Sequence, residues 1–285
     1  MTGPEITRRW HRIPGERYDR VKEFLLKNEE YYVAACARFL RIRENGGHLW
    51  YLGAQEDEIS ALLLHSRQTL FPVFNKNRGV PGPRFLNRFL RKTNIHAVQG
   101  LREEAELLEA LMENQGYFAE ERIDYNLMSL DNLPKNVISK SVPSNLVLRK
   151  PQAGDELDLY QLQAAYEQEE VLPGNSVFNP DSCRHNLKRI LSSEQILVAE
   201  LDGCLVGKIN TSAESFTRYQ IGGVYVRPDC RGLGIGTRMT AQFSRELLNR
   251  GKGLTLFVKK RNIAAEKIYR RNGFSILADY RINYY

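Results

Sequence analysis

A glycine-rich turn between an expected strand and an expected helix is the feature that most constrains this chain. The turn reads Arg-Gly-Leu-Gly-Ile-Gly at 231–236, after an extended pattern at 219–226 and before a helical pattern from Thr237 to about Arg250. Glycine lets the backbone turn with its N–H groups exposed, and the start of a helix adds the positive end of a dipole. A turn of this kind is typical of a site that binds a diphosphate.

Two familiar phosphate-binding loops do not fit this turn. A P-loop requires Gly-Lys-Ser/Thr, whereas Gly236 is followed by Thr237 and Arg238. A dinucleotide-binding fingerprint requires a third glycine where Met239 stands. The preceding strand carries two adjacent glycines at 222–223, which often mark a bulge or a place where a ligand approaches the backbone.

The charge around the turn favours an anionic partner. Residues 227–271 hold twelve basic and three acidic side chains, a net charge of +9 in a chain whose total is +7. Such a segment favours nucleic acid or a phosphorylated small molecule, and a solvated basic face is the alternative. Because the segment has no interleaved aromatic residues and no helix-turn-helix signature, nucleic acid is the least supported of these partners.

Composition narrows the class of protein further. At about 150 residues per domain, a chain of 285 residues is expected to form two domains. No apolar run is long enough for a membrane span and no signal-peptide pattern opens the chain, so we expect no membrane partner and a cytoplasmic protein. The four cysteines show neither CxxC pairing nor histidine spacing, which predicts reduced thiols and no metal site.

A serine- and proline-rich stretch divides the chain. We interpret residues 131–144 as a linker between a domain at 1–130 and a second domain at 145–285. The second domain is expected to contain a strand, two helices, three strands, the glycine-rich turn with its helix, and a last strand–helix–strand unit. These elements are expected at 146–151, 155–171, the helix after Asn179-Pro180, 196–201, 204–215, 219–226, 237–250, 254–258, 262–272 and 274–285.

The first half repeats part of this plan. Residues 107–127 align with 264–284 at a constant offset, and residues 49–67, with Asp57 near the turn, resemble the expected hairpin at 196–212. The aligned pairs are Gly116 with Gly273, Tyr117 with Phe274 and Asn126 with Asn283. The sequence therefore predicts a duplicated unit, although any helix that ends in glycine before a strand gives a similar pattern.

The turn and a second motif resemble the Gcn5-related N-acetyltransferase superfamily. Its Arg/Gln-x-x-Gly-x-Gly/Ala motif matches Arg231, Gly234 and Gly236. Its second signature falls at the expected distance, from Asn262 to Phe274, and the order of elements matches over 145–285. The resemblance implies a mixed α/β fold of tandem acetyltransferase-like units, each a central, mostly antiparallel sheet flanked by helices, with a degenerate copy at 1–130.

The same resemblance implies acetyl-CoA as co-substrate. Strand residues Val224, Tyr225 and Val226 would pair with its pantetheine arm, and a bulge at 222–223 would splay this strand from the next to admit the arm. Asn262 matches a position that contacts the cofactor, with a plain helix N-cap as the alternative. The N–H groups that would hold the pyrophosphate are those of Arg231, Gly232, Leu233, Gly234, Ile235, Gly236 and Thr237. The cations that would border its phosphates are Arg231, Arg227, Lys259, Lys260 and Arg261.

Tyr269 matches the general acid of the family. A tyrosine with its ordinary pKa is protonated at neutral pH and can donate to a departing thiolate, while a core aromatic is the alternative. The base that accepts the amine proton is less defined. The carboxylates considered for it are Glu214, Glu167, Glu169 and Glu170, each with a solvated-surface alternative. Cys230 has no activating histidine in sequence and is interpreted as an ordinary loop thiol.

The first half lacks the corresponding chemistry. Met112 stands where Tyr269 does and Ala105 where Asn262 does, and no Arg-x-x-Gly-x-Gly occurs in 1–143. Its aromatic residues are interpreted as core rather than as a substrate cage; they include Tyr31, Tyr32, Trp50 and Tyr51.

The leading prediction is an acetyl-CoA-dependent N-acetyltransferase that acts by direct transfer in a ternary complex. The acceptor is expected to be a primary amine of a small molecule or a peptide, and its identity and the oligomeric state stay open. The alternative is a CoA or acetyl-CoA sensor or scaffold without transferase activity.

Overall fold

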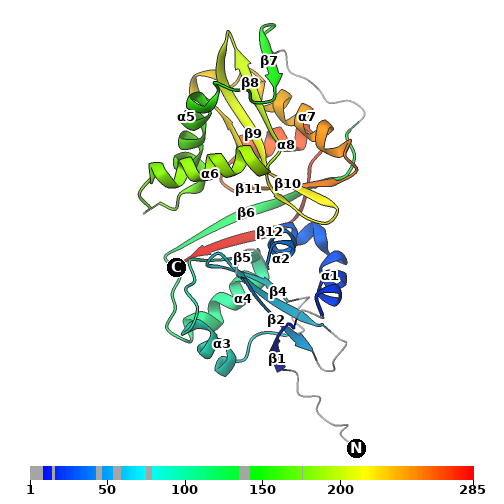
Figure 1. The fold of residues 1–285 in the computed structure, drawn as a ribbon, viewed down its shortest axis with the longest axis vertical. Coiled ribbons are helices and arrows are strands. Elements are labelled where there is room, and N and C mark those ends of the chain that lie inside the picture. Colours follow the sequence, from blue (N-terminus) through cyan, green and yellow to red (C-terminus); the bar gives the residue numbers. More distant parts are fainter. Residues whose placement is uncertain are drawn as a thin grey trace, which may run out of the picture. The chain divides into compact units, whose positions relative to one another are not determined.

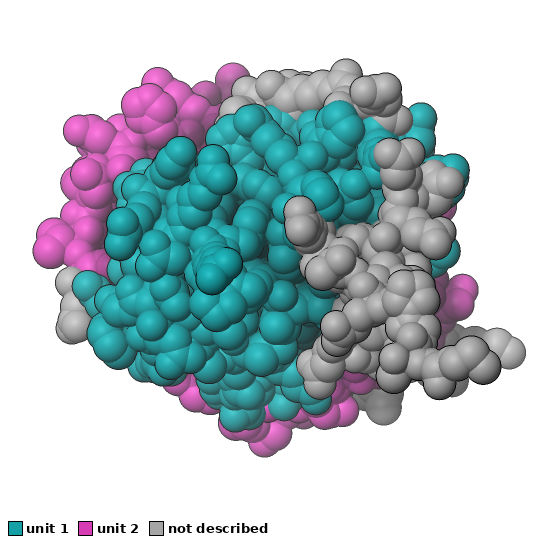
Figure 2. All heavy atoms as spheres, turned by 90° about the horizontal axis from the view of Figure 1, so that it is seen from below, with its two compact units in different colours: residues 1–125, 278–285 teal, residues 126–277 magenta. Residues whose placement is uncertain are grey.

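The computed structural model describes residues 9–14, 17–42, 47–53, 59–74, 79–134, 142–174 and 176–285. The chain divides into two compact units (Figure 2): unit 1 is Met1–Tyr125 with Ala278–Tyr285, and unit 2 is Asn126–Leu277. The last eight residues thus belong to unit 1, whereas the sequence division at 1–130 and 145–285 follows chain order. Within the expected linker, 135–141 lie outside the described residues, as does Asp57.

Unit 1 is a sheet with helices on both faces (Figure 1). Its strands, in sheet order, are β1 (Arg9–Arg12), β2 (His48–Gly53), β3 (Ala61–Ser66), β4 (Thr69–Val73), β5 (Ala97–Leu101) and the C-terminal part of β12 (Ser275–Tyr284). Its helices are α1 (Tyr18–Leu26), the short 3-10 turn η2 (Glu29–Tyr31), α2 (Val33–Leu40), α3 (Pro83–Leu90) and α4 (Arg102–Glu113). The expected hairpin at 49–67 is present, since Leu49 pairs with Leu64 in antiparallel register.

Alternate residues of the unit 1 strands face different helices. Leu63, Leu70 and Val98 are fully buried with apolar side chains of α3 and α4, while α2 contacts β3. Neighbouring strands are antiparallel except β4 and β5, which run parallel and pair only through Thr69↔Ala97 and Leu70↔Val98.

Unit 2 repeats this arrangement. Its strands, in sheet order, are the end of β6 (Glu121–Leu130), β11 (Gly253–Lys259), β10 (Arg218–Val226), β9 (Cys204–Glu214), β8 (Ile196–Leu201) and β7 (Leu146–Arg149). Its helical segments are α5 (Glu156–Tyr166), the π-helical turn η3 (Glu167–Val171), α6 (Pro180–Ser193), the 3-10 turn η4 (Pro228–Cys230), α7 (Ile235–Leu248) and α8 (Ile263–Arg271). Tyr225 packs with α5 and α6, whereas Val224 and Val226 pack with α7 and α8 on the other face.

The aligned segments of the two units share their backbone geometry. Gly116 and Gly273 follow α4 and α8 with left-handed φ angles of 84° and 92°. The next N–H in each unit donates back into the helix over 3.1 Å, from Tyr117 to Met112 and from Phe274 to Tyr269. A glycine closes each helix in this way because it adopts positive φ without a Cβ penalty. Because the strands and helices of the two units also follow the same order along the chain and in the sheet, the predicted duplication is confirmed.

Two element boundaries differ from the sequence expectation. The helix expected from Thr237 begins at Ile235, because Gly234 adopts a left-handed φ of 78° and serves as its N-cap. The helix expected over 155–171 is α-helical only to Tyr166 and then continues as the π-helical turn η3. π-Helical turns are often found at functional sites.

The C-terminal part of β12 should be required for the stability of unit 1. Tyr280 is 3% exposed and pairs with Leu101, so Tyr280→Ala should lower the free energy of unfolding by about 3–5 kcal/mol. Hydrogen exchange of the β5 amides should accelerate more than that of the β10 and β11 amides. Ile276→Ala, at a position 40% exposed on the same strand, is the control and should have little effect. Equal losses from the two substitutions would contradict this assignment.

Candidate functional site

The site of unit 2 is built where two parallel strands separate. β10 and β11 pair from Arg218↔Gly253 to Ile221↔Leu256, and the ladder ends there although both strands continue. Beyond this point the backbone of Val224–Val226 has lost its β11 neighbour. The expected strand separation beside Gly222–Gly223 is therefore present in the structure.

A β-bulge coincides with the end of this ladder. Gly222 pairs with Asn210 and Tyr225 with Lys208, so Gly223 and Val224 together oppose one residue of β9. Gly223 has a left-handed φ of 58°, and a Cβ there would lie 2.0 Å from Asn210 Oδ1 and 2.8 Å from Lys208 Nζ. Glycine is required at this position for conformation and for space.

Lys208 holds the bulge from within the sheet. Its side chain is fully buried, and Nζ donates to Gly223 O at 3.0 Å and to Asn210 Oδ1 at 2.9 Å. The ring of Tyr166 lies 4.8 Å from Nζ, and the Tyr166 hydroxyl accepts from Gly223 N at 3.2 Å. Burial lowers the pKa of Lys208 to about 7, opposed by the nearby Glu167.

The glycine-rich turn leads into α7 beside the bulge. The first hydrogen bond of the helix is donated by Arg238 to Gly234 O at 3.0 Å, so the three preceding N–H groups have no acceptor within it. Gly232 has a φ of 84°, and a Cβ there would meet no atom within 4 Å. At Gly236 a Cβ would lie 3.3 Å from Ile268. Free N–H groups and open space are what a diphosphate requires.

Arg231 ties the turn to neighbouring elements. Its guanidinium donates to Val226 O at 2.9 Å and to Glu169 Oε2 at 2.7 Å, and it lies 5.4 Å from the Tyr225 ring. Arg227 pairs with Asp229 at 2.6 Å. These two side chains, expected to border phosphates, thus have protein partners in this structure, and the candidate anion donors are main-chain groups.

Asn262 caps α8 and connects it to η3. Its Oδ1 accepts from Ala265 N at 3.0 Å, which confirms an N-cap, and its Nδ2 donates to Glu170 at 2.9 Å. The other oxygen of Glu170 lies 3.7 Å from Nζ of the buried Lys259. The π-helical turn therefore reaches the glycine-rich turn through Glu169 and α8 through Glu170.

Tyr269 projects from α8 into this region. It is 6% exposed, and its ring packs edge-on against Phe274 at 6.1 Å. Burial raises the pKa of its hydroxyl, with further contributions from Tyr166 and Glu170. The hydroxyl is therefore protonated at neutral pH.

Other sequence candidates lie elsewhere or have another environment. Glu214 pairs in register with Tyr219 and forms an ion pair with Lys252 at 2.7 Å, four residues, or about 14 Å, along β9 from Asn210. The structure does not bring it to the bulge. Glu167 accepts from Gln163 and Asn186. Burial raises the pKa of the Cys230 thiol, which keeps it protonated.

Sequence reasoning missed Lys208 and Tyr166. Lys208 stands in an alternating polar pattern with Asn210 and Ser212, which is typical of a solvated strand face. The adjacent glycines at 222–223 were the signal that could have directed attention to their cross-strand neighbours. Tyr166 follows the helical spacing of a core residue.

Unit 1 has no equivalent turn among its described residues. A Cβ on Gly79 would lie 1.9 Å from Leu52, and Val80 O accepts from Trp10 Nε1 at 3.2 Å, so this segment packs against the sheet. α3 begins at Pro83, which has no N–H to offer an anion. No group of side chains suited to a metal ion and no helix able to cross a membrane occurs in the described ranges.

Gly223→Ala should destabilise unit 2 more than backbone strain alone explains. Gly251, which has a φ of 79° and where an added Cβ would meet no atom within 4 Å, is the matched control. Its alanine variant should lose about 1 kcal/mol from conformation, whereas Gly223→Ala also displaces Asn210 and Lys208. Thermal unfolding measures both variants, and equal losses would contradict a tightly packed bulge.

Burial of Lys208 predicts a pH dependence of stability. Its folded-state pKa of about 7 lies below the value of about 10.4 in an unfolded chain, so between these pH values the unfolded chain binds more protons. The stability of the native protein relative to Lys208→Met should therefore rise as pH rises from about 7 to about 10. Lys252→Met, which removes the partner of Glu214, is the control for general pH effects. A pH-independent difference would contradict the lowered pKa.

Comparisons with known proteins agree with this geometry. The family described as Acetyltransferase (GNAT) matches residues 158–274. No curated protein matches the chain. Similar solved structures include a Drosophila protein, with 13% identity over 97% of this chain and 98% of that chain and a TM-score of 0.66. A tandem GNAT protein from the clavulanic acid biosynthesis pathway has 12% identity over 97% and 98% of the two chains, with a TM-score of 0.60.

A third similar structure is a GCN5-related N-acetyltransferase from Sphaerobacter thermophilus, with 18% identity over 99% of this chain and 96% of that chain and a TM-score of 0.58. At these identities the solved structures support the fold. Residues 158–274 are therefore a domain of the GNAT acetyltransferase family, within a chain that has the fold of tandem GNAT proteins.

Proposed function

We propose that unit 2 transfers an acetyl group from acetyl-CoA to a primary amine by direct transfer in a ternary complex. The observation that carries the proposal is that the β10–β11 ladder ends beside the glycine-rich turn. The N–H groups at this turn have no acceptor within α7, and the buried Tyr269 hydroxyl nearby is protonated. Family membership of residues 158–274 supports acetyl transfer as the reaction class.

The residues of the turn fit a diphosphate. The N–H groups of Ile235, Gly236 and Thr237 lack helical acceptors, and the space beside Gly232 is open. We assign them to the pyrophosphate of the co-substrate, which the positive end of the α7 dipole also attracts. The edge of Val224–Val226 that has lost its β11 neighbour would bind the pantetheine arm.

The chemistry requires two proton movements. The amine nitrogen attacks the thioester carbonyl carbon, the carbon–sulfur bond breaks, and Tyr269 donates its hydroxyl proton to the departing thiolate. A main-chain N–H near Val224–Val226 would polarise the carbonyl oxygen. The proton that the amine loses must reach a base.

Glu170 is the carboxylate that we assign to the amine. Of the four carboxylates considered from the sequence, it is the one that acts electrostatically on Tyr269. It is partly exposed and bonded to Asn262, the cap of the helix that carries the tyrosine. It would attract the cationic amine and accept its proton directly or through water.

Tyr269→Phe should lower turnover and leave acetyl-CoA affinity nearly unchanged. The substitution removes the donor and keeps the ring packed against Phe274. Loss of a general acid typically reduces the rate by about 10²–10⁴-fold. Steady-state release of free thiol with an amine acceptor measures turnover, and calorimetric titration with acetyl-CoA measures affinity.

Tyr219→Phe is the matched control, because Tyr219 is equally buried at 6% but lies at the other end of β10. It should retain full turnover. Equal turnover in Tyr269→Phe and the native protein would contradict the assignment of Tyr269 as the general acid. Acetyl-CoA binding without acceptor-dependent thiol release across an amine library would favour the sensor or scaffold alternative.

A further inference from the structure

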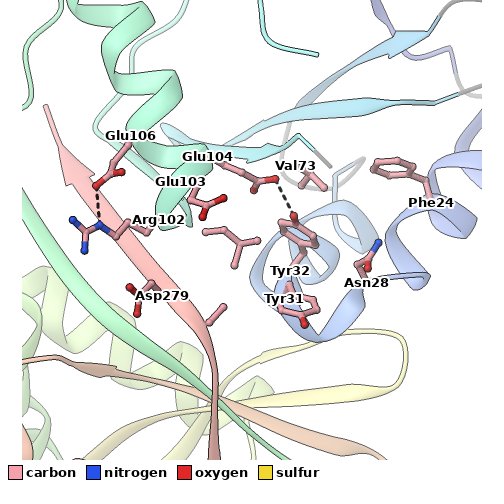
Figure 3. A pocket seen from close by; sticks show the side chains of 12 residues that line it. Phe24, Asn28, Tyr31, Tyr32, Val73, Arg102, Glu103, Glu104, Glu106 and Asp279 are labelled. Carbon is pink, nitrogen blue, oxygen red and sulfur yellow. Dashed lines mark hydrogen bonds and ion pairs between the residues drawn. The ribbon is translucent and has the colours of Figure 1, made fainter. Parts of the chain in front are cut away.

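Unit 1 contains a cavity of about 590 Å³ where β4 and β5 separate (Figure 3). The ladder between the two strands ends at Leu70↔Val98, and the cavity opens beyond that pair, between Val73, Leu101 and the first turn of α4. Another side is closed by side chains from α1, η2 and the residues that follow each of them: Phe24, Asn28, Tyr31 and Tyr32. A volume in this range is typical of sites for small organic ligands.

Glu104 is the distinctive residue of this cavity. It is 7% exposed, and its Oε1 accepts from Tyr32 Oη at 2.9 Å and from Phe74 N at 2.7 Å. Its Oε2 is buried and has no hydrogen-bond partner among the described residues. Figure 3 shows the carboxylate extending from α4 toward Tyr32, with Glu103 beside it. An unpaired buried carboxylate oxygen is costly, and a ligand N–H would satisfy it.

The lining of the cavity is acidic and partly aromatic. Its charged members are Glu103, Glu104, Glu106, Asp279 and Arg102. Arg102 donates to Glu106 at 2.7 Å and Arg281 lies 3.0 Å from the same carboxylate, so the acidic character of the lining comes from its other carboxylates. The sign is opposite to that of the basic segment 227–271 of unit 2. An anion such as CoA is therefore disfavoured here, and a cation is favoured.

The two neighbouring tyrosines of the cavity have different roles. Both line the cavity, but Tyr32 is buried and holds Glu104, as expected for a core residue, whereas Tyr31 is only partly buried and lies with its ring 6.4 Å from that of Tyr32. The sequence interpretation of both as core is therefore corrected for Tyr31. With Phe24 and Val73 it gives the cavity an apolar wall against which the carbon skeleton of a ligand can pack.

We propose that this cavity is a binding site for an aliphatic primary ammonium compound, whose N–H is accepted by Glu104 Oε2 and whose chain packs against Tyr31 and Phe24. A carboxylate acceptor with a free oxygen selects a cationic donor, and the charge-assisted bond is stronger than a neutral one. This site is separate from the proposed acetyl-transfer site of unit 2, and the evidence for one does not depend on the other.

The protonation of Glu104 should make ligand binding depend on pH. Burial raises its pKa to about 7, with a smaller contribution from Glu103, while the bonds from Phe74 and Tyr32 oppose the rise. Tyr280 also faces it, and burial keeps that hydroxyl protonated by raising its pKa. Below about pH 7 the carboxyl is neutral, so affinity for an ammonium ion should increase from about pH 6 to about pH 8.

The test uses the full chain and n-butylammonium as the probe. Binding is followed by NMR through the amide signals of Val73, Phe74 and 101–106, with n-butanol as the neutral probe of the same size. We expect saturable shifts with n-butylammonium and none with n-butanol. Glu104→Gln, which keeps an oxygen for Tyr32 and Phe74, should weaken binding about tenfold or more.

Two controls make the outcome decisive. Glu113→Gln, on the same helix but paired with Arg122, should bind as the native protein does. Tyr269→Phe and saturating acetyl-CoA should leave the unit 1 shifts unchanged, which separates this site from the function proposed for unit 2. If Glu104→Gln does not fold, the native shift map and its pH dependence decide. Shifts confined to unit 2, equal shifts with n-butanol, or affinity independent of pH would overturn the proposal.

Discussion

The hydrogen bond from a buried lysine to the bulge carbonyl is the interaction on which unit 2 depends. Lys208 Nζ donates to Gly223 O at the point where β10 stops pairing with β11. Burying a cation costs free energy unless it finds partners, and here Asn210 and the ring of Tyr166 supply the others. The strand separation that the site requires is thus fixed from inside the sheet and not by the residues that line it.

The same parallel strand pair recurs in unit 1 with different chemistry around it. β4 and β5 also separate after a short ladder, but the following segment packs through Gly79 and begins α3 with Pro83. Unit 1 therefore has no turn with exposed N–H groups at this place among its described residues. The polar group beside its strand separation is the buried carboxylate of Glu104. The duplicated fold therefore presents main-chain N–H groups in unit 2 and a buried carboxylate in unit 1 at the corresponding strand separation, because the backbone geometry leaves the lining side chains unspecified.

Local signals account for the elements that the sequence predicted well. Asn262 caps α8 through a bond to a residue three positions away, and Gly273 closes the same helix through its own left-handed φ angle. The burial of Lys208 and Glu104 could not be predicted from such local signals. A lysine in an alternating strand and a glutamate in the first turn of a helix both read as solvated, and their burial depends on elements far along the chain. Tyr32, the partner of Glu104, lies 72 residues away in sequence.

The π-helical turn explains how distant parts of the unit 2 site are held together. The last turn of α5 continues as η3, and its neighbouring carboxylates then contact two elements, Glu169 the glycine-rich turn through Arg231 and Glu170 the cap of α8 through Asn262. A regular α-helix places adjacent residues about 100° apart, so a change of helical period alters which elements such a pair can reach. One short segment therefore contacts both the glycine-rich turn and the helix that carries Tyr269, and so connects the proposed binding region of the acetyl donor with the proposed acid.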